Sequence, residues 1–168
     1  DQLESEYCVD VKRVFSSGFS NGGMMSHRLA CELSDRIAAI GAVSGTIAIP
    51  TCTPTRPVPV LHIHGKDDIV VAYDNGGFSG GEGVPQTIAT WVANDGCTDT
   101  TPTNMYLQGD VSCNEYVTCT GNANVELCDV SDGGHQWPGG LPDGVGTLSM
   151  DLDASEYIAE FFDTHPMQ

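Results

Sequence analysis

The alternation of apolar and polar positions along the chain predicts strands separated by helices. Runs of β-branched, aromatic and other apolar residues predict four strands, at residues 11–17, 37–43, 58–64 and 125–130. The second of these segments is a continuous apolar run, which is typical of a strand buried on both faces of a parallel sheet. We therefore expect a sheet whose central strands are covered on both sides.

Three other segments carry apolar residues at helical spacing. We expect helices at residues 22–33 and 86–94, the second ending at Gly96, and a final amphipathic helix capped by Asp153. The residues expected to face the core are Met25, Leu29 and Leu33 in the first helix, Ile88, Trp91 and Val92 in the second, and Ala154, Tyr157, Ile158, Phe161 and Phe162 in the third.

This order of elements predicts an α/β fold with a mostly parallel sheet and flanking helices. Residues 98–123 break the alternation with short polar and apolar repeats, and we expect them to form a β-hairpin excursion stapled by disulfides. A length of 168 residues suits one unit, so residues 1–168 are predicted to form a single domain.

Acidic side chains dominate the charge of the chain. Six lysine and arginine residues against 23 aspartate and glutamate residues give a formal net charge of −17. Such a surface repels nucleic acids and anionic membranes, and no apolar run reaches the length of a membrane span. We expect a soluble protein that binds neither nucleic acid nor membrane.

Seven cysteines without a C-x-x-C spacing favour disulfides over a zinc-ribbon or thioredoxin-type site. Disulfides require an oxidising compartment, so we expect a secreted, extracellular protein. The hairpin excursion and the last strand should bring the later cysteines together. The expected pairs are Cys97 with Cys119, Cys113 with Cys128 and, more loosely, Cys31 with Cys52, which leaves Cys8 unpaired.

A serine lies at the junction of the first predicted strand and helix, in the G-x-S-x-G pattern of Gly18, Ser20 and Gly22. The glycines let the strand turn sharply into the helix, which would hold Ser20 in a strained and exposed conformation. The helix N-terminus and the Asn21 N–H would stabilise negative charge on an attacked carbonyl oxygen. The pattern predicts Ser20 as a nucleophile and Asn21 as the first oxyanion donor; an ordinary turn is the alternative.

Two more polar side chains follow predicted strands at the same edge of the sheet. Asp68 comes after the strand at 58–64, and His135 comes after the strand at 125–130. A histidine there can remove the serine proton while a carboxylate orients the imidazole, a chemistry that needs no metal or organic cofactor. The adjacent Asp67 is the rival for the role of the acid.

Four stretches carry a resemblance to a known family: G-F-S-N-G-G-M-M from Gly18, L-A-C from Leu29, H-G-K-D-D from His64 and G-H-Q-W-P-G from Gly134. They resemble the secreted polyhydroxybutyrate depolymerase and feruloyl or acetylxylan esterase family of α/β-hydrolases, and the resemblance covers nearly the whole chain. It implies Asp68 as the acid and His135 as the base. We expect Trp137 and Phe19 to bind substrate, with packing an equal role for Trp137.

Members of this family carry a further N-terminal part, whose H-G-type loop supplies the second oxyanion N–H, and no such motif precedes Ser20 here. We therefore expect either a chain truncated at its N-terminus, which holds the C-terminal part of the fold, or a reduced version of the enzyme. Without the upstream strands, the segment from Val11 to Ser17 would be an open edge. We expect it to pair with the missing segment or to form a homo-oligomer.

Together these patterns predict a serine carboxylic-ester hydrolase that forms an acyl-enzyme. Its expected substrates are small-molecule or polymeric esters of the polyester (polyhydroxybutyrate-like), feruloyl or acetyl class, which fold and triad do not separate. The alternative is a non-catalytic binding or interaction module built on an incomplete hydrolase scaffold.

Overall fold

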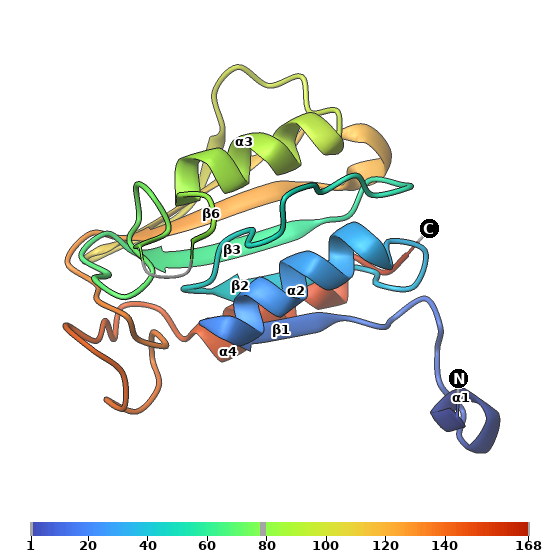
Figure 1. Cartoon of the computed structure of the whole chain (residues 1–168), viewed down its shortest axis with the longest axis horizontal. Coiled ribbons are helices and arrows are strands. Elements are labelled where there is room, and N and C mark those ends of the chain that lie inside the picture. The colour runs from blue at the N-terminus through green and yellow to red at the C-terminus, as the bar shows by residue number, and fades with distance from the viewer. Residues whose placement is uncertain (1, 78–79, 168) are drawn as a thin grey trace.

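The computed structural model describes residues 2–77 and 80–167, which contain a six-stranded sheet (Figure 1). The strands lie in the order β1-β2-β3-β6-β5-β4. Their bounds are Ser16–Phe19 for β1, Ile40–Val43 for β2, Val60–Gly65 for β3, Thr103–Gln108 for β4, Val111–Tyr116 for β5 and Val125–Val130 for β6. The first three and β6 run parallel, and the β4–β5 hairpin joins β6 in antiparallel. The predicted class, a mostly parallel α/β sheet, is confirmed.

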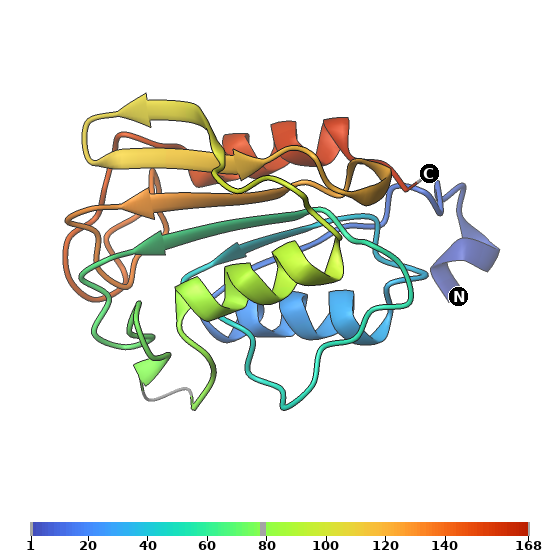
Figure 2. The same cartoon turned by 90° about the horizontal axis from the view of Figure 1, so that it is seen from above.

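Helices cover both faces of this sheet (Figure 2). Helices α2 (Asn21–Glu32) and α3 (Val84–Asn94) lie on one face, and α4 (Ala154–Thr164) lies on the other. A short helix, α1 (Gln2–Glu6), stands away from the sheet near the N-terminus, and a 3₁₀ turn, η2, spans Thr120–Asn122. Within the described part of the chain, no helix is both long and apolar enough to cross a bilayer.

Each face of the sheet packs its own hydrophobic cluster. Ile63 and Phe161 belong to the cluster under α4, and Val60 and Trp91 belong to the cluster under α2 and α3. Strands β2 and β3 are buried along their whole length because helices cover them on both sides. At Gly41 in β2 a Cβ would lie 2.7 Å from the Ile158 side chain, so α4 packs directly on the strand.

Local signals predicted the start of α4 and the end of α3, whereas α3 begins at Val84, two residues earlier than predicted. The Asp153 carboxylate accepts the backbone N–H groups of Ser155 and Glu156, which caps α4. Helix α3 is followed by Gly96 at a φ of 62°, a conformation that suits glycine after a helix end. Ile88 and Trp91 point into the core as predicted.

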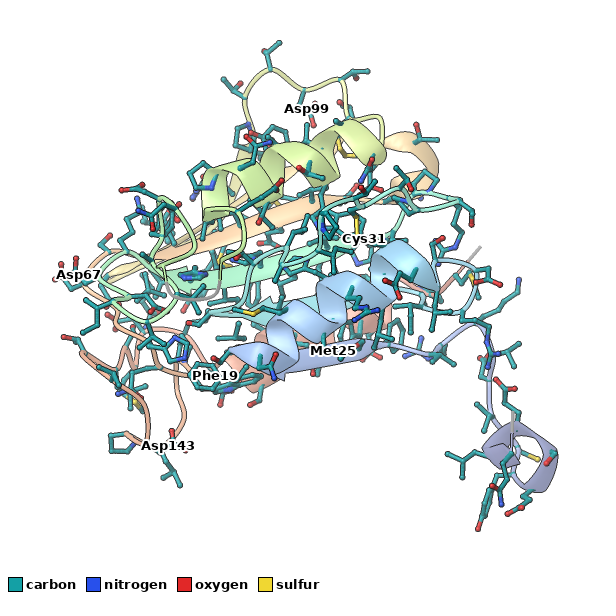
Figure 3. All side chains as sticks on the ribbon, in the orientation of Figure 1. Phe19, Met25, Cys31, Asp67, Asp99 and Asp143 are labelled. Atoms are coloured by element: carbon teal, nitrogen blue, oxygen red, sulfur yellow. A yellow bond between two sulfur atoms is a disulfide. The ribbon has the colours of Figure 1, made fainter. Side chains whose placement is uncertain are left out.

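The face of α2 that meets the sheet differs from the prediction. Met25 is 49% exposed and Leu33 is 43% exposed, whereas the small Gly23 and Ala30 are buried; Figure 3 shows Met25 on α2. A Cβ on Gly23 would lie 3.1 Å from the Val43 carbonyl oxygen, so this turn of the helix sits close to the strand ends. Close approach favours small residues on the inner face, and the longer side chains therefore point outward.

The first strand is shorter than predicted. The segment from Val11 to Arg13 forms a turn because the Asp10 side chain accepts the Lys12 N–H and the Asp10 carbonyl accepts the Arg13 N–H. Regular pairing starts at Ser16, in parallel with β2, which is the predicted neighbour. Helix α1 was not predicted, since Leu3 is the only apolar residue among its five and forms no apolar face.

All three predicted disulfides are present: Cys31 with Cys52, Cys97 with Cys119 and Cys113 with Cys128, while Cys8 is a free, exposed thiol. Cys113 and Cys128 lie directly opposite one another on β5 and β6. The predicted disulfide-stapled hairpin is present, and it extends the sheet beside β6.

Strand β1 lies at the end of the strand order, and no strand among the described residues pairs with its outer edge. The Ser16 N–H donates to the Ala39 carbonyl just before β2, and the Ser20 N–H donates to the Val43 carbonyl at its end. By the alternation of a strand the Ser17 N–H faces the open side. We expect the chain to self-associate along this edge, to a degree that rises with concentration in light scattering.

Ser17→Pro is the matched test of that association. It removes an outward N–H and leaves the ladder to β2 intact, so it should reduce the association. A monomer at every concentration, or association that is unchanged in Ser17→Pro, would contradict the use of this edge.

Candidate active site

The turn between β1 and α2 holds Ser20 in a strained backbone conformation. Its φ is 56° and its ψ is −117°, a region that side-chain-bearing residues rarely adopt. A Cβ on Gly18 would lie 2.5 Å from the Gly22 carbonyl carbon, so the strand end and the first helical turn touch through backbone. This tight strand–turn–helix presents the Ser20 hydroxyl at the C-terminal edge of the parallel strands.

A glycine that the sequence pattern did not single out also shapes this turn. A Cβ on Gly45, just after β2, would overlap the Ser20 carbonyl oxygen, whereas a Cβ on Gly22 would meet nothing within 4 Å. Close backbone contacts therefore exclude a side chain at positions 18 and 45, but not at position 22. The signal available in the sequence was the Ser-Gly pair that ends a buried strand at the same sheet edge.

His135 lies between Ser20 and Asp68 in one hydrogen-bonded line. The distance from His135 Nε2 to Ser20 Oγ is 2.9 Å, and the distance from His135 Nδ1 to Asp68 Oδ2 is 2.7 Å. The side chain of His135 is 8% exposed and that of Asp68 is fully buried. The structure thus brings together three side chains that are separated by up to 115 positions in the chain.

Close backbone packing places the histidine loop beside β3. A Cβ on Gly65, at the end of β3, would overlap the Gly133 carbonyl oxygen, so the two strand ends meet without intervening side chains. The Gly134 N–H donates to the Thr147 carbonyl, and the His135 carbonyl accepts the Val145 N–H. These bonds hold both sides of the loop and aim the imidazole at Ser20.

Asp68 is anchored as a carboxylate. Its Oδ1 accepts the backbone N–H groups of Val70 and Val71, both at 2.8 Å. Burial on its own would raise the pKa of Asp68, but hydrogen bonds from His64, from His135 and from the two backbone groups lower this pKa to about 2. The carboxyl is therefore charged at neutral pH, with Oδ2 left to accept from His135.

The rival acid points elsewhere. Asp67 is exposed, and its side chain projects outward beyond the end of β3 (Figure 3). Its backbone N–H donates to the Gly133 carbonyl, which fixes the residue in the turn. Of the two aspartates, Asp68 is the one within hydrogen-bonding distance of His135.

Asn21 is the first residue of α2, directly after Ser20. A backbone N–H at this helical position has no carbonyl acceptor within its own helix. It therefore lies at the positive end of the helix, next to the serine hydroxyl, where an oxyanion would form.

Comparisons with known proteins find esterases among the relatives of this chain. A protein-family model described as Phospholipase/Carboxylesterase matches residues 2–79. Over 150 residues the chain is 35% identical to Feruloyl esterase B of Piromyces equi, covering 80% of the chain and 27% of that protein. Over 149 residues it is 32% identical to Feruloyl esterase C of Emericella nidulans, covering 88% of the chain and 50% of that protein. The chain belongs to the α/β-hydrolase esterase family.

A solved structure with lower sequence identity has the same fold. The acetyl xylan esterase from Aspergillus awamori aligns with a TM-score of 0.63 over 96% of this chain and 63% of that one, at 15% identity. The chain spans half or less of the length of the two feruloyl esterases. The α/β-hydrolase esterase fold is thus shared over nearly all of this chain but over only part of its relatives.

The two residues expected to bind substrate in this α/β-hydrolase lie in different surroundings. The Phe19 ring lies beside the His135 imidazole, with ring centroids 4.7 Å apart, and is partly buried. Trp137 packs against the cluster under α4, and its indole N–H donates to Ser155 Oγ at 3.1 Å. Phe19 therefore borders the Ser20 site, while the contacts of Trp137 favour its packing role.

One group of side chains in the described residues has the spacing of a metal site. Cys113, Glu126 and Cys128 present ligand atoms within 4.8 Å of one another. The two sulfur atoms are joined in a disulfide, so neither is a thiolate that could bind a metal ion. This group is a structural disulfide beside a glutamate and not a metal site.

Proposed function

We propose that this chain carries the nucleophile, base and acid of a carboxylic-ester hydrolase. Ser20 is the nucleophile, His135 the general base and Asp68 the acid that orients His135. The observation that carries the proposal is the unbroken hydrogen-bonded line from Ser20 Oγ through both nitrogens of His135 to a buried, ionised Asp68. Its family supports the same chemistry.

The reaction proceeds in two halves. As Ser20 Oγ attacks the ester carbonyl carbon, His135 Nε2 accepts the hydroxyl proton and then gives it to the departing alcohol oxygen. A water molecule next attacks the acyl-serine, His135 takes its proton, and the acid product leaves as Ser20 Oγ recovers a proton. The Asn21 N–H at the α2 N-terminus stabilises the oxyanion of each tetrahedral intermediate. Asp68 stabilises the imidazolium formed in both halves.

The named relatives suggest the substrate class. Proteins called feruloyl esterase and acetyl xylan esterase match this chain, so feruloyl and acetyl esters are the substrates proposed first. A polyester of the polyhydroxybutyrate type is the third candidate. The three disulfides favour an oxidising compartment and hence a secreted enzyme.

A fluorophosphonate probe and a substrate panel test the proposal. The probe labels only an activated serine, so we expect one covalent adduct, located at Ser20 by peptide mapping. The panel contains methyl ferulate, acetylated xylan and a short hydroxybutyrate oligomer. An intact fold with no adduct and no hydrolysis would favour a non-catalytic binding module on the same scaffold.

A further inference from the structure

Three buried histidines lie in a row behind the proposed active site, and the reaction itself uses none of them. His27 comes from α2, and His62 and His64 come from β3; all three are at most 1% exposed. Trp91 of α3, fully buried, stands at one end of the row. We call Trp91, His27, His62 and His64 the histidine chain.

Hydrogen bonds join the histidine chain end to end. Trp91 Nε1 lies 3.0 Å from His27 Nδ1, and His27 Nε2 lies 3.2 Å from His62 Nδ1. His62 Nε2 lies 3.0 Å from His64 Nδ1. The last ring nitrogen, His64 Nε2, lies 2.8 Å from the Val71 carbonyl oxygen and 3.4 Å from Asp68 Oδ2.

The Trp91 indole at one end of the histidine chain and the Val71 carbonyl at the other determine which nitrogen of each imidazole carries the proton. An indole N–H can only donate, so His27 Nδ1 accepts from Trp91 and the proton of a neutral His27 lies on Nε2. The same reasoning at the next two rings places their protons on Nε2. His64 Nε2–H therefore donates to the Val71 carbonyl, which can only accept. The donor at one end and the acceptor at the other thus require the same Nε2–H tautomer in all three rings.

The His27 and His62 rings are neutral, as these hydrogen bonds require. Burial, with a smaller effect from His64, lowers the pKa of His27 to about 3, although the Gly45 carbonyl favours a proton on that ring. Burial, His64 and His27 hold the pKa of His62 well below its ordinary value. A charged ring would carry protons on both nitrogens and would point one of them at a donor.

The histidine chain ends beside Asp68, the carboxylate that orients the proposed base His135. Val71 offers its carbonyl to His64 and its N–H to Asp68 Oδ1, so His64 supports the turn that holds the carboxylate. The same His64 N–H faces Asp68 Oδ2, the oxygen that binds His135. The opposite tautomer would place a lone pair against both oxygens and would repel them.

We propose that His64, held in its Nε2–H form by the histidine chain, is a positioning residue for Asp68. This role rests on the proposed ester hydrolysis but makes its own statement about proton positions. The neutral donor keeps the carboxylate and its supporting turn in place without adding a second positive charge next to His135. Three consecutive buried imidazoles thereby serve one purpose, which is to give His64 a single tautomer and a single ring orientation.

Nitrogen-15 NMR of the histidine-labelled chain tests the proton positions without any substrate. We expect His27, His62 and His64 each to show a protonated Nε2 and an unprotonated Nδ1. A protonated Nδ1 on any of the three would overturn the proposed direction. This measurement decides the proposal even if the chain hydrolyses no ester.

Two substitutions at His64 test the positioning role. His64→Leu removes the donor and should lower kcat by about 10- to 100-fold, the size expected for one hydrogen bond to a charged group, with KM nearly unchanged. It should also shift the downfield proton signal of His135 Nδ1–H. His64→Gln keeps a donor towards Val71 and an acceptor towards His62, and should recover most of the activity and the signal.

Ile88→Val is the matched control. It trims a buried side chain of α3 in the same cluster that holds Trp91 and leaves every bond of the histidine chain intact. It should lose stability without moving the His135 signal or kcat. If His64→Leu is folded and leaves the signal unmoved, His64 has no positioning role, whether or not the chain is an esterase.

Discussion

Ser20→Ala is expected to reduce kcat for p-nitrophenyl acetate by about 10⁶-fold, to the background set by binding and oxyanion stabilisation. The loss is large because no acyl-enzyme can form without the hydroxyl, and His135 then has no proton to transfer. The fold should be retained, since the side chain lies at the site surface and the strained backbone already tolerates a Cβ at this position. Release of p-nitrophenol measures the rate, and urea unfolding measures the stability.

Ser17→Ala is the control for this substitution. Ser17 is an exposed serine in β1, three positions before Ser20, and its removal should leave kcat unchanged. Activity above background in folded Ser20→Ala would remove Ser20 from the mechanism. Equal losses in the two variants would point to a disturbed strand rather than a missing nucleophile.

Asp68→Asn is expected to lower kcat by about 10⁴-fold through a reversed tautomer of His135. The two backbone N–H groups of Val70 and Val71 require an oxygen at the Oδ1 position, so the new amide nitrogen must face His135 Nδ1. That amide donates to Nδ1 and leaves the imidazole proton on Nε2, where it blocks acceptance of the Ser20 proton. Initial rates at saturating ester measure the effect.

Asp67→Asn is the matched control because it makes the same chemical change one residue earlier on an exposed side chain. We expect it to change kcat by less than about two-fold, as no interaction of its carboxylate reaches His135 and a surface charge contributes little. If Asp67→Asn proves the more damaging change, the acid has been assigned to the wrong aspartate.

The stability of the fold at acid pH gives an independent test of the charge on Asp68. Its pKa is lowered in the folded chain to about 2 from an ordinary value of 3.8, so its ionised form favours folding. That contribution is fully present above pH 3.8 and is lost as the pH falls through about 2. Asp68→Asn should lack this part of the acid unfolding curve.

Local patterns in the sequence were sufficient to predict much of this protein. A continuous apolar run identified β2, the apolar and β-branched residues of 58–64 identified β3, and the side chain of Asp153 marked the start of α4. The placement of serine, aspartate and histidine after three of the predicted strands also predicted that the three would meet, since parallel strands end at one edge. These features depend on neighbours in the chain, which a sequence displays directly.

Contacts between distant segments were decided only by the tertiary structure. The close approach of α2 to Val43 selected its small residues for the inner face and turned Met25 outward. The overlap that a Cβ on Gly45 would make with Ser20 depends on two loops 25 positions apart, and the hairpin joined the sheet by pairing with β6. The proton direction of the histidine chain likewise follows from an indole on α3 and a carbonyl beyond β3. Spacing along a sequence records periodicity within one element, but the distance and orientation between elements arise only when their surfaces pack together.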